Sequence, residues 1–162
     1  MKKRLFYLLA AIIACILFLG SWSAISGSGP ESGKENIRWY SYEDGIKQVK
    51  NTGRKGFLHF YTDWCGYCRK MEQDTFSDSE VIAYLNANFV PIKIDAEDKP
   101  KIAEKFGADR FPFNWFIDGE TTRIGSRPGF IPPQLMVYIL EYVNKNEYRE
   151  MRLDEYVEQQ QK

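Results

Sequence analysis

Residues 57–68 read FLHFYTDWCGYC, and this stretch decides the fold. Its first half, from Phe57 to Tyr61, is a short and almost wholly aromatic and apolar run, which predicts a strand covered on both faces, as in a parallel sheet. From Cys65 the pattern turns helical, with Met71 and Phe76 at the inward-facing positions. The sequence therefore predicts a buried strand followed at once by a helix that begins at a cysteine.

Cys65 and Cys68 lie one helical turn apart at the start of that predicted helix. A thiol attacks a disulfide only as the thiolate, and the unpaired N–H groups and positive dipole end of a helix N-terminus stabilise a negative charge. We therefore expect Cys65 to be the attacking nucleophile. Cys68, expected to be more buried, would be the resolving thiol that breaks the mixed disulfide without any backbone rearrangement.

Two other uses of such a cysteine pair have to be weighed. Structural zinc takes four Cys or His ligands, and outside the pair the chain offers only Cys15 and His59, which disfavours a zinc site. A permanent structural disulfide is the stronger alternative. Against it, so short a loop constrains the unfolded chain little, and strained or exposed disulfides tend to be labile.

Outward from this stretch, the sequence predicts alternating helices and strands. The first expected elements are a helix from Ser41 to about Asn51 ended by Gly53 and Gly56, the strand 57–61 and the helix from Cys65. A short helix capped by Ser77 or Asp78 follows, then a strand over 89–94 and a helix opened by Asp98 and Pro100 and closed by Gly107. The chain is then expected to form a hairpin of 113–117 and 121–124, turning at Asp118-Gly119, and a final helix from Pro132 or Pro133. This order predicts an α/β fold in which a mixed β-sheet is sandwiched between helices.

The residues around the cysteines resemble a known superfamily. Residues 64–68 (WCGYC), followed by Arg69-Lys70-Met71, resemble the active site of thioredoxin-like proteins, and residues 106–112 are similar to the segment that leads to the family's cis-proline. The resemblance covers roughly residues 39–144 and is strongest to exported thioredoxin-related proteins of the disulfide reductase type. It implies a thioredoxin-like fold with a redox-active Cys65–Cys68 disulfide, and neither a cofactor nor a metal.

The resemblance also gives Pro112 and Phe111 a role. In the family this proline is cis, packs beside the dithiol and makes the preceding residue, here Phe111, offer its backbone to an extended substrate segment. The chain departs from many relatives by having Phe113 after the proline, where they carry threonine. That departure bears on substrate preference rather than on the fold.

Four further residues are expected to support the site. Gly66 and Tyr67 would tune the thiolate, and Trp64 either covers the edge of the core or forms a lid over the sulfurs. His59 stands six residues before Cys65, where thioredoxins carry a buried acid that moves a proton to or from the resolving thiol. An imidazole can act as that base near neutral pH, but a core histidine satisfied by the backbone is the favoured interpretation.

The N-terminus has the form of an export signal or a membrane anchor. Lys2, Lys3 and Arg4 precede an apolar run that ends in small residues, so residues 1–29 are interpreted as a signal peptide or an N-terminal membrane anchor. The positive-inside rule then places the rest of the chain outside the cytoplasm, in the periplasm or its equivalent. Cys15 loosely resembles a lipidation site, but the apolar run continues after it, which disfavours lipidation.

The remaining boundaries follow from composition. Residues 26–35 are rich in Gly and Ser and are expected to be a flexible linker, residues 36–147 to be the folded domain, and residues 148–162 to be a charged tail forming a loosely attached helix or a frayed end. Without the three N-terminal cations the chain has 19 basic and 22 acidic residues. It therefore has no basic footprint for nucleic acid.

The leading hypothesis is a thiol–disulfide oxidoreductase acting on protein thiols and disulfides, with the family likeness favouring reduction. A reductant outside the cytoplasm needs an electron supplier, so a membrane electron-transfer partner is expected. One alternative is a carrier that holds Cu(I) between Cys65 and Cys68, since soft thiolates suit that ion. Another is a non-catalytic binding module whose docking surface would be aromatic: Trp64, Tyr67, Phe111, Phe113 and Trp115.

Overall fold

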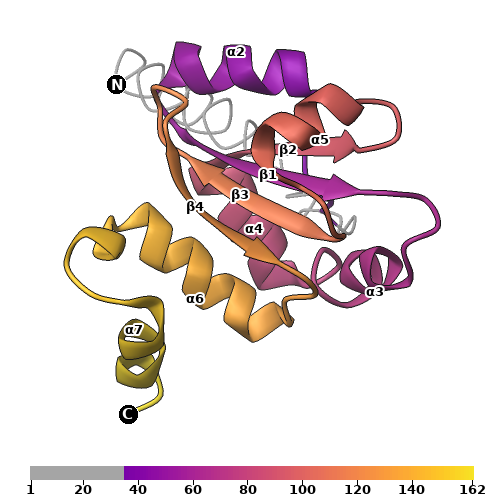
Figure 1. Cartoon of the computed structure of the whole chain (residues 1–162). Coiled ribbons are helices and arrows are strands. Elements are labelled where there is room, and N and C mark those ends of the chain that lie inside the picture. The colour runs from indigo at the N-terminus through magenta and orange to yellow at the C-terminus, as the bar shows by residue number, and fades with distance from the viewer. Residues whose placement is uncertain (1–34) are drawn as a thin grey trace, which may run out of the picture. The chain divides into compact units, whose positions relative to one another are not determined.

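The computed structural model describes residues 35–162, and a four-stranded mixed sheet forms their centre (Figure 1). The strands are β1 (Lys55–Tyr61), β2 (Phe89–Asp95), β3 (Phe113–Ile117) and β4 (Arg123–Pro128), in the spatial order β2-β1-β3-β4. β2 is parallel to β1, whereas β3 is antiparallel to both β1 and β4. The predicted α/β fold with a mixed sheet is confirmed.

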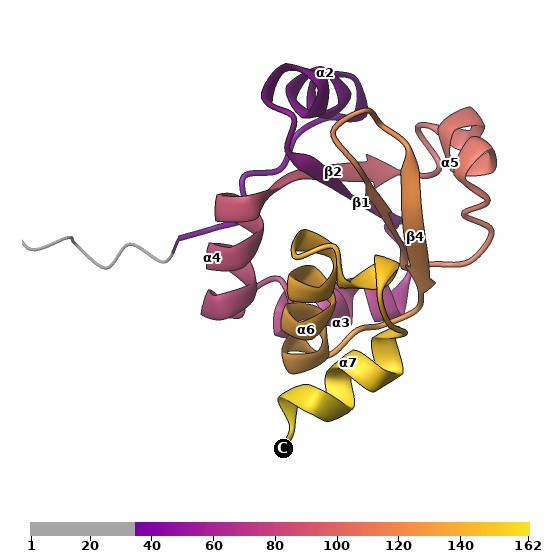
Figure 2. The same ribbon diagram turned by 90° about the vertical axis from the view of Figure 1, so that its left-hand side faces the viewer.

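Helices cover both faces of this sheet (Figure 2). They are α2 (Tyr42–Thr52), α3 (Gly66–Asp74), α4 (Ser79–Asn88), α5 (Pro100–Phe106) and α6 (Pro133–Asn144), followed by the 3-10 helix η1 (Glu147–Arg149) and by α7 (Leu153–Gln160). Side chains of α2 and α5 pack in one core cluster, and side chains of α3, α4 and α6 pack in the other. The sheet is therefore enclosed between two helical layers, as the sequence predicts.

The central strand β1 contributes to both clusters. Leu58 and Phe60 belong to the cluster that includes α2 and α5, and Phe57 belongs to the opposite one. His59 points the same way as Phe57, because side chains alternate along a strand and its ring lies 4.9 Å from that of Phe76. A strand buried on both faces explains why residues 57–61 are nearly continuous in apolar and aromatic side chains.

Most predicted helix ends are confirmed. Ser41 and Asp78 accept hydrogen bonds from the first turns of α2 and α4, and Gly53 and Gly107 end α2 and α5 with positive φ. The prediction for Gly56 is wrong, because this glycine lies within β1. A Cβ atom there would come within 2.7 Å of Ile117 Cγ1, so close packing requires the glycine.

Two element starts also differ from the prediction. Helix α5 begins at Pro100 with Lys99 as its N-cap, so Asp98 lies before the helix rather than opening it. Strand β4 begins at Arg123 instead of Thr121, because the turn is longer than two residues. Asp118 closes that turn by accepting hydrogen bonds from the amides of Glu120 and Thr122 at 3.0 and 2.7 Å.

The C-terminal segment is attached more firmly than predicted. The sequence predicts a loosely attached helix or a frayed end over residues 148–162, and the helix α7 lies there, but its Tyr156 is only 3% exposed. The Tyr156 ring lies 5.4 Å from that of Tyr142 on α6, and its hydroxyl donates a hydrogen bond to Glu141 at 3.1 Å. The description as a frayed or loosely attached end is therefore wrong for α7.

The two edges of the sheet differ. Tyr40 covers part of the β2 edge: its amide donates to Pro91 O at 2.9 Å, and its carbonyl accepts from Lys93 N at 3.1 Å. Within residues 35–162 the outer edge of β4 has no strand partner. Arg123, Gly125, Arg127 and Pro128 make up most of that strand.

The expectations for the N-terminus concern residues outside the described part of the chain. The signal or anchor over 1–29, lipidation at Cys15 and all but the last residue of the 26–35 linker fall there. Among residues 35–162, none of the helices is both long and apolar enough to span a bilayer.

Candidate active site at the first turn of α3

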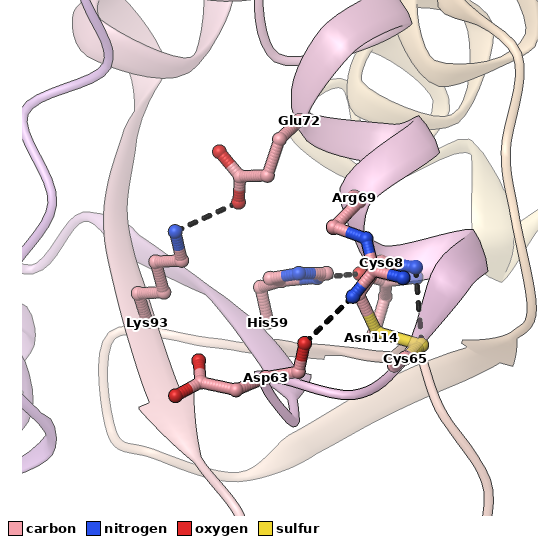
Figure 3. Close-up of a disulfide and its surroundings, with 8 residues drawn as sticks. All are labelled: His59, Asp63, Cys65, Cys68, Arg69, Glu72, Lys93 and Asn114. Carbon is pink, nitrogen blue, oxygen red and sulfur yellow. Dashed lines mark hydrogen bonds and ion pairs between the residues drawn. A yellow bond between two sulfur atoms is a disulfide. The ribbon is translucent and has the colours of Figure 1, made fainter.

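Cys65 and Cys68 form a disulfide at the N-terminal end of α3 (Figure 3). Cys65 is the N-cap residue, and Cys68 lies in the first turn, so their Cα atoms are 5.2 Å apart. The amide of Cys68 donates a hydrogen bond to the Sγ atom of Cys65 at 3.0 Å. A sulfur in this position faces a backbone donor and the positive end of the helix dipole, both of which stabilise a thiolate once the disulfide is reduced.

The segment before the disulfide is fixed to α3. Arg69 donates from Nη1 to the carbonyl oxygen of Asp63 at 2.8 Å, and the first turn of α3 contains no acidic residue. Cys65 and Cys68 are 5% and 3% exposed, so both sulfurs are largely covered. The sequence identified Arg69 only as part of the motif, and its bond to a main-chain oxygen could not be predicted from residue type.

Pro112 follows a cis peptide bond after Phe111, as the family resemblance implies. The proline is buried, and its carbonyl accepts a hydrogen bond from the amide of Gly129 at 2.7 Å. Phe111 is half-buried and its ring lies 6.3 Å from that of Trp64 in an edge-on arrangement. The loop before β3 and the loop before α3 therefore meet beside the disulfide.

Trp64 is 67% exposed, so the interpretation that it covers the edge of the core is wrong. Its indole Nε1 donates to Glu97 Oε1 at 3.1 Å, which ties it to the loop after β2. Tyr67 is 66% exposed. A Cβ atom at Gly66 would meet no atom within 4 Å, so packing does not require a glycine at that position.

His59 is completely buried beneath the site. The sequence predicts that the backbone satisfies its ring, but the hydrogen-bond partner is the side chain of Asn114. His59 Nδ1 lies 2.8 Å from Asn114 Oδ1, and Asn114 Nδ2 donates to the carbonyl of Arg127 at 3.2 Å. Because the Asn114 Nδ2 group donates to Arg127, the atom that faces His59 is Asn114 Oδ1, which can only accept a hydrogen bond. His59 Nδ1 therefore carries the hydrogen. Nε2 then has a free lone pair, and no hydrogen-bond partner lies within reach of it.

The surroundings keep His59 neutral. Complete burial, assisted by the positive charge of Lys93 and opposed by the hydrogen bond to Asn114, lowers the pKa of His59 to about 4. Lys93 Nζ forms an ion pair with Glu72 Oε1 at 2.8 Å and lies 4.8 Å above the ring of Tyr61. Figure 3 shows His59, Asn114, Lys93 and Glu72 together with the disulfide.

Sequence reasoning missed Glu72, Lys93 and Asn114. Asn114 gives one usable signal, since a polar residue inside the buried strand FNWFI needs a hydrogen-bond partner. Lys93 and Glu72 give no such signal, because a lysine on an edge strand and a glutamate on a helix surface are ordinary exposed residues.

The predicted aromatic surface divides into two groups. Phe113 is 8% exposed, and Trp115 donates from Nε1 to the carbonyl of Phe106 at 2.8 Å, so both pack within the domain. Trp64, Tyr67 and Phe111 remain at the surface around Cys65. Within residues 35–162, no three or more His, Cys, Asp or Glu side chains gather in a way that could hold a metal ion.

A cysteine pair at a helix N-terminus, beside a cis-proline on a mixed sheet, defines the thioredoxin-like class of proteins. The model of the thioredoxin-like domain family matches residues 42–144, and the chain belongs to that family. The family resemblance inferred from the sequence is thereby confirmed.

Similar proteins differ from this chain in length and sequence. The thioredoxin-like protein HCF164 of Arabidopsis thaliana chloroplasts is 28% identical over 99 residues, which are 60% of this chain and 36% of that protein. The protein disulfide isomerase-like 5-3 of Oryza sativa is 32% identical over 65 residues, covering 40% of this chain and 15% of that protein. The chain thus matches only about a third or less of the length of these two relatives.

Two solved structures show the same fold. A thioredoxin from Thermus thermophilus has a TM-score of 0.62 and 24% identity, with 67% of this chain and 87% of that chain covered. The DsbH oxidoreductase has a TM-score of 0.59 and 20% identity, with coverage of 68% and 85%. At these identities the likeness concerns the fold alone.

Proposed function

We propose that the chain is a thiol–disulfide oxidoreductase that reduces disulfides in protein clients outside the cytoplasm. The observation that carries this proposal is the Cys65–Cys68 disulfide at the N-terminus of α3, next to Phe111 and cis-Pro112. A main-chain segment held along Phe111 would present its disulfide to Cys65. The names of similar proteins, a disulfide isomerase-like protein and an oxidoreductase, agree with this chemistry.

The proposed reaction has two exchange steps. The Cys65 thiolate attacks one sulfur of a client disulfide, a Cys65–client disulfide forms, and the other client sulfur leaves as a thiolate and takes up a proton. Cys68 then loses its proton and attacks Cys65 Sγ, which releases the second client thiolate. Two electrons pass to the client, and the chain is left with the Cys65–Cys68 disulfide of this structure.

Repeated turnover requires a reductant for that disulfide. Because the proposed site lies outside the cytoplasm, we propose a membrane electron-transfer protein as the donor. The order of a basic start and an apolar run in residues 1–29 supports this location. Fusing residues 1–35 to alkaline phosphatase, which is active only after export, tests it: an active fusion is expected, and an inactive one contradicts the location.

Single cysteine variants test the chemistry. Cys65→Ser is expected to abolish reduction of insulin disulfides by the reduced protein, because the attacking sulfur is gone. Cys68→Ser should instead accumulate a covalent Cys65–client species, visible by non-reducing electrophoresis and mass spectrometry. Equal turnover in Cys65→Ser and the parent protein would refute the assignment, and tight Cu(I) binding without any turnover would favour a metal carrier.

A further inference from the structure

Two adjoining cavities lie between β4, α6 and the segment that follows α6. The inner cavity, of about 340 Å³, is lined by residues 124–127 of β4 and by the C-terminal half of α6. The outer cavity, of about 680 Å³, is lined by Arg127, by Leu135 near the start of α6 and by α7. Arg127, Tyr142 and Leu153 line both cavities. The two cavities therefore form one trough along β4, called the β4 trough below.

The outer wall of the β4 trough lies outside the family domain. The match to the thioredoxin-like domain family ends at residue 144, and α7 comes after it. The outer lining residues from this later segment are Arg152, Leu153, Asp154, Val157 and Glu158. Figures 1 and 2 show α7 beside α6. The residues described around the dithiol, from Trp64 to Cys68 and Phe111 to Pro112, line neither cavity, so the trough is a separate surface.

The inner cavity is apolar and has space at Gly125. Its aromatic walls are Tyr142 and Tyr148, whose hydroxyls donate within the domain to Met151 O at 2.7 Å and to Asn146 Oδ1 at 3.3 Å. Gly125 pairs with Phe116, whose side chain packs in the cluster of α6. A Cβ atom at Gly125 would meet no atom within 4 Å. A large apolar side chain from another molecule therefore finds room on this face of the strand.

The open edge of β4 borders the trough. In the described part of the chain, β3 is the only strand that pairs with β4. The outward main-chain groups of β4 are thus free to bond an extended segment, as in strand addition to a sheet edge. Pro128 has no amide hydrogen, which confines such pairing to the residues before it. An acyl chain offers no matching row of donors and acceptors, so a strand fits this edge better.

The charges of the trough favour an acidic residue beside Arg127. Of the described residues, Arg127 is the only charged one that lines the inner cavity, and its guanidinium is in no ion pair. In the outer cavity Arg152 and Asp154 pair with each other at 2.9 Å. Glu158 lines the outer cavity alone and is exposed.

The other charges nearby leave Arg127 without a competing carboxylate in the inner cavity. The Arg123 guanidinium donates to the carbonyl of Lys105 and lies over the ring of Phe106, so it belongs to the opposite face of the sheet. The remaining charged residues of α6, η1 and α7 line neither cavity: Glu141, Lys145, Glu147, Arg149, Glu150 and Glu155. An anion opposite Arg127 is therefore attracted by an unpaired cation.

We propose that β4 binds an extended segment of a partner protein with the pattern apolar–x–acidic–x–apolar. The acidic side chain pairs across the edge with Arg127. Side chains two positions away lie on the same face of a strand, about 6.6 to 6.8 Å along it, so one enters the inner cavity over Gly125 and the other enters the outer cavity. The pattern reads the same in both strand directions. This inference does not depend on the proposed redox function.

Four labelled peptides test the proposal with the full-length protein, by fluorescence anisotropy. The first reads phenylalanine–threonine–glutamate–threonine–leucine. The second has lysine for glutamate, the third has serine for both apolar residues, and the fourth exchanges glutamate with a neighbouring threonine, which moves the charge to the other face. The first should bind most tightly, and the lysine peptide roughly tenfold more weakly, because like charges directly opposite each other on neighbouring strands repel. The difference should shrink at high salt.

Variants localise the binding. Arg127→Glu should reverse the preference and favour the lysine peptide, whereas Lys101→Glu, the same charge change at an exposed position of α5, should leave it unchanged. Gly125→Leu fills the inner cavity and should weaken the first peptide while retaining the preference for glutamate over lysine. Cys65→Ser should bind all four peptides as the parent protein does. Amide shift changes on binding the first peptide should map to β4, α6 and α7.

Each contrary outcome overturns the proposal. Equal affinity for the glutamate and lysine peptides does so, as does a preference for glutamate that persists in Arg127→Glu. Shift changes gathered around Cys65 would assign the peptide to the dithiol site instead. If no peptide binds at millimolar concentration, decanoate bound in the trough would assign it to an acyl chain, and a dimer in sedimentation would assign it to a second copy of the chain.

Discussion

His59 is a neutral imidazole in the core, fixed as the Nδ1–H form by Asn114. Its pKa of about 4 means that the ring gains no proton in the folded state near neutral pH. The lone pair on Nε2 is thus unprotonated at neutral pH, but a pKa of about 4 makes this ring a weak base for a thiol proton. Its part in proton transfer to or from Cys68 stays a prediction from the sequence.

The shifted pKa of His59 makes the folded state sensitive to acid. In the unfolded chain the pKa is near the ordinary value of 6.5, so between pH 6.5 and about 4 the unfolded state binds a proton that the folded state does not. The free energy of unfolding should therefore fall through this window, by up to about 3 kcal/mol, and level off below it.

Denaturant titrations between pH 4 and 7.5 measure this loss, and His59→Leu serves as the comparison. The variant lacks the titrating group, so the part of the pH dependence due to His59 should vanish whatever its overall stability. Parallel stability curves for the parent and His59→Leu would contradict the assignment.

At the scale of single residues, the sequence identifies the reacting cysteines better than the buried side chains that surround them. Cys65, Cys68 and Pro112 are recognisable from one short motif and one proline. The partner of His59 is Asn114, which stands opposite it in the register of β1 and β3. That register results from the pairing of strands 55 residues apart in sequence, and no local pattern specifies it.

At the scale of elements, Tyr156 is the one side chain of helix α7 that is buried. Tyr156 is buried against α6, donates to Glu141 and lies near Lys145 Nζ at 3.5 Å. Tyr156→Ala should lower the free energy of unfolding by about 2–4 kcal/mol through lost burial. Tyr156→Phe keeps the ring and should cost only about 1 kcal/mol for the hydrogen bond.

Chemical denaturation of the two variants tests this difference, and hydrogen exchange in residues 153–160 gives a local readout. Tyr156→Ala should expose the α7 amides to rapid exchange. Protection of α7 unchanged in Tyr156→Ala would contradict the idea that this side chain holds the helix.

The elements themselves follow closely from local chemistry. Ser41 and Asp78 cap their helices as predicted, since a side-chain oxygen there satisfies free amides of the first turn. The packing of α7 is not evident from its sequence, which is charged and rich in glutamine, because Leu153, Tyr156 and Val157 form only one short apolar stripe. The stability of α7 therefore comes from its contacts with α6 more than from interactions within the helix.

For the whole molecule, the fold class followed from the order of helices and strands, but the strand order did not. An alternation of this kind is compatible with several arrangements of the strands, and the resemblance around residues 64–68 was needed to select one. The arrangement brings the segment after β2, helix α5 and the loop before β3 together, and an open apolar cavity beside Phe111 lies between them. No segment taken alone indicates this cavity.

The composition of β4 affects how the molecules behave at high concentration. An open strand edge can pair with the same edge of a second copy and seed aggregates, and charged side chains and proline oppose such pairing. Arg123 and Arg127 place two positive charges along this edge, and Pro128 removes an amide donor at its end. We expect Arg127→Val to raise self-association in sedimentation velocity, with Arg149→Val as the charge-matched control. The charges and the proline that oppose edge pairing thus lie on the strand farthest from β2.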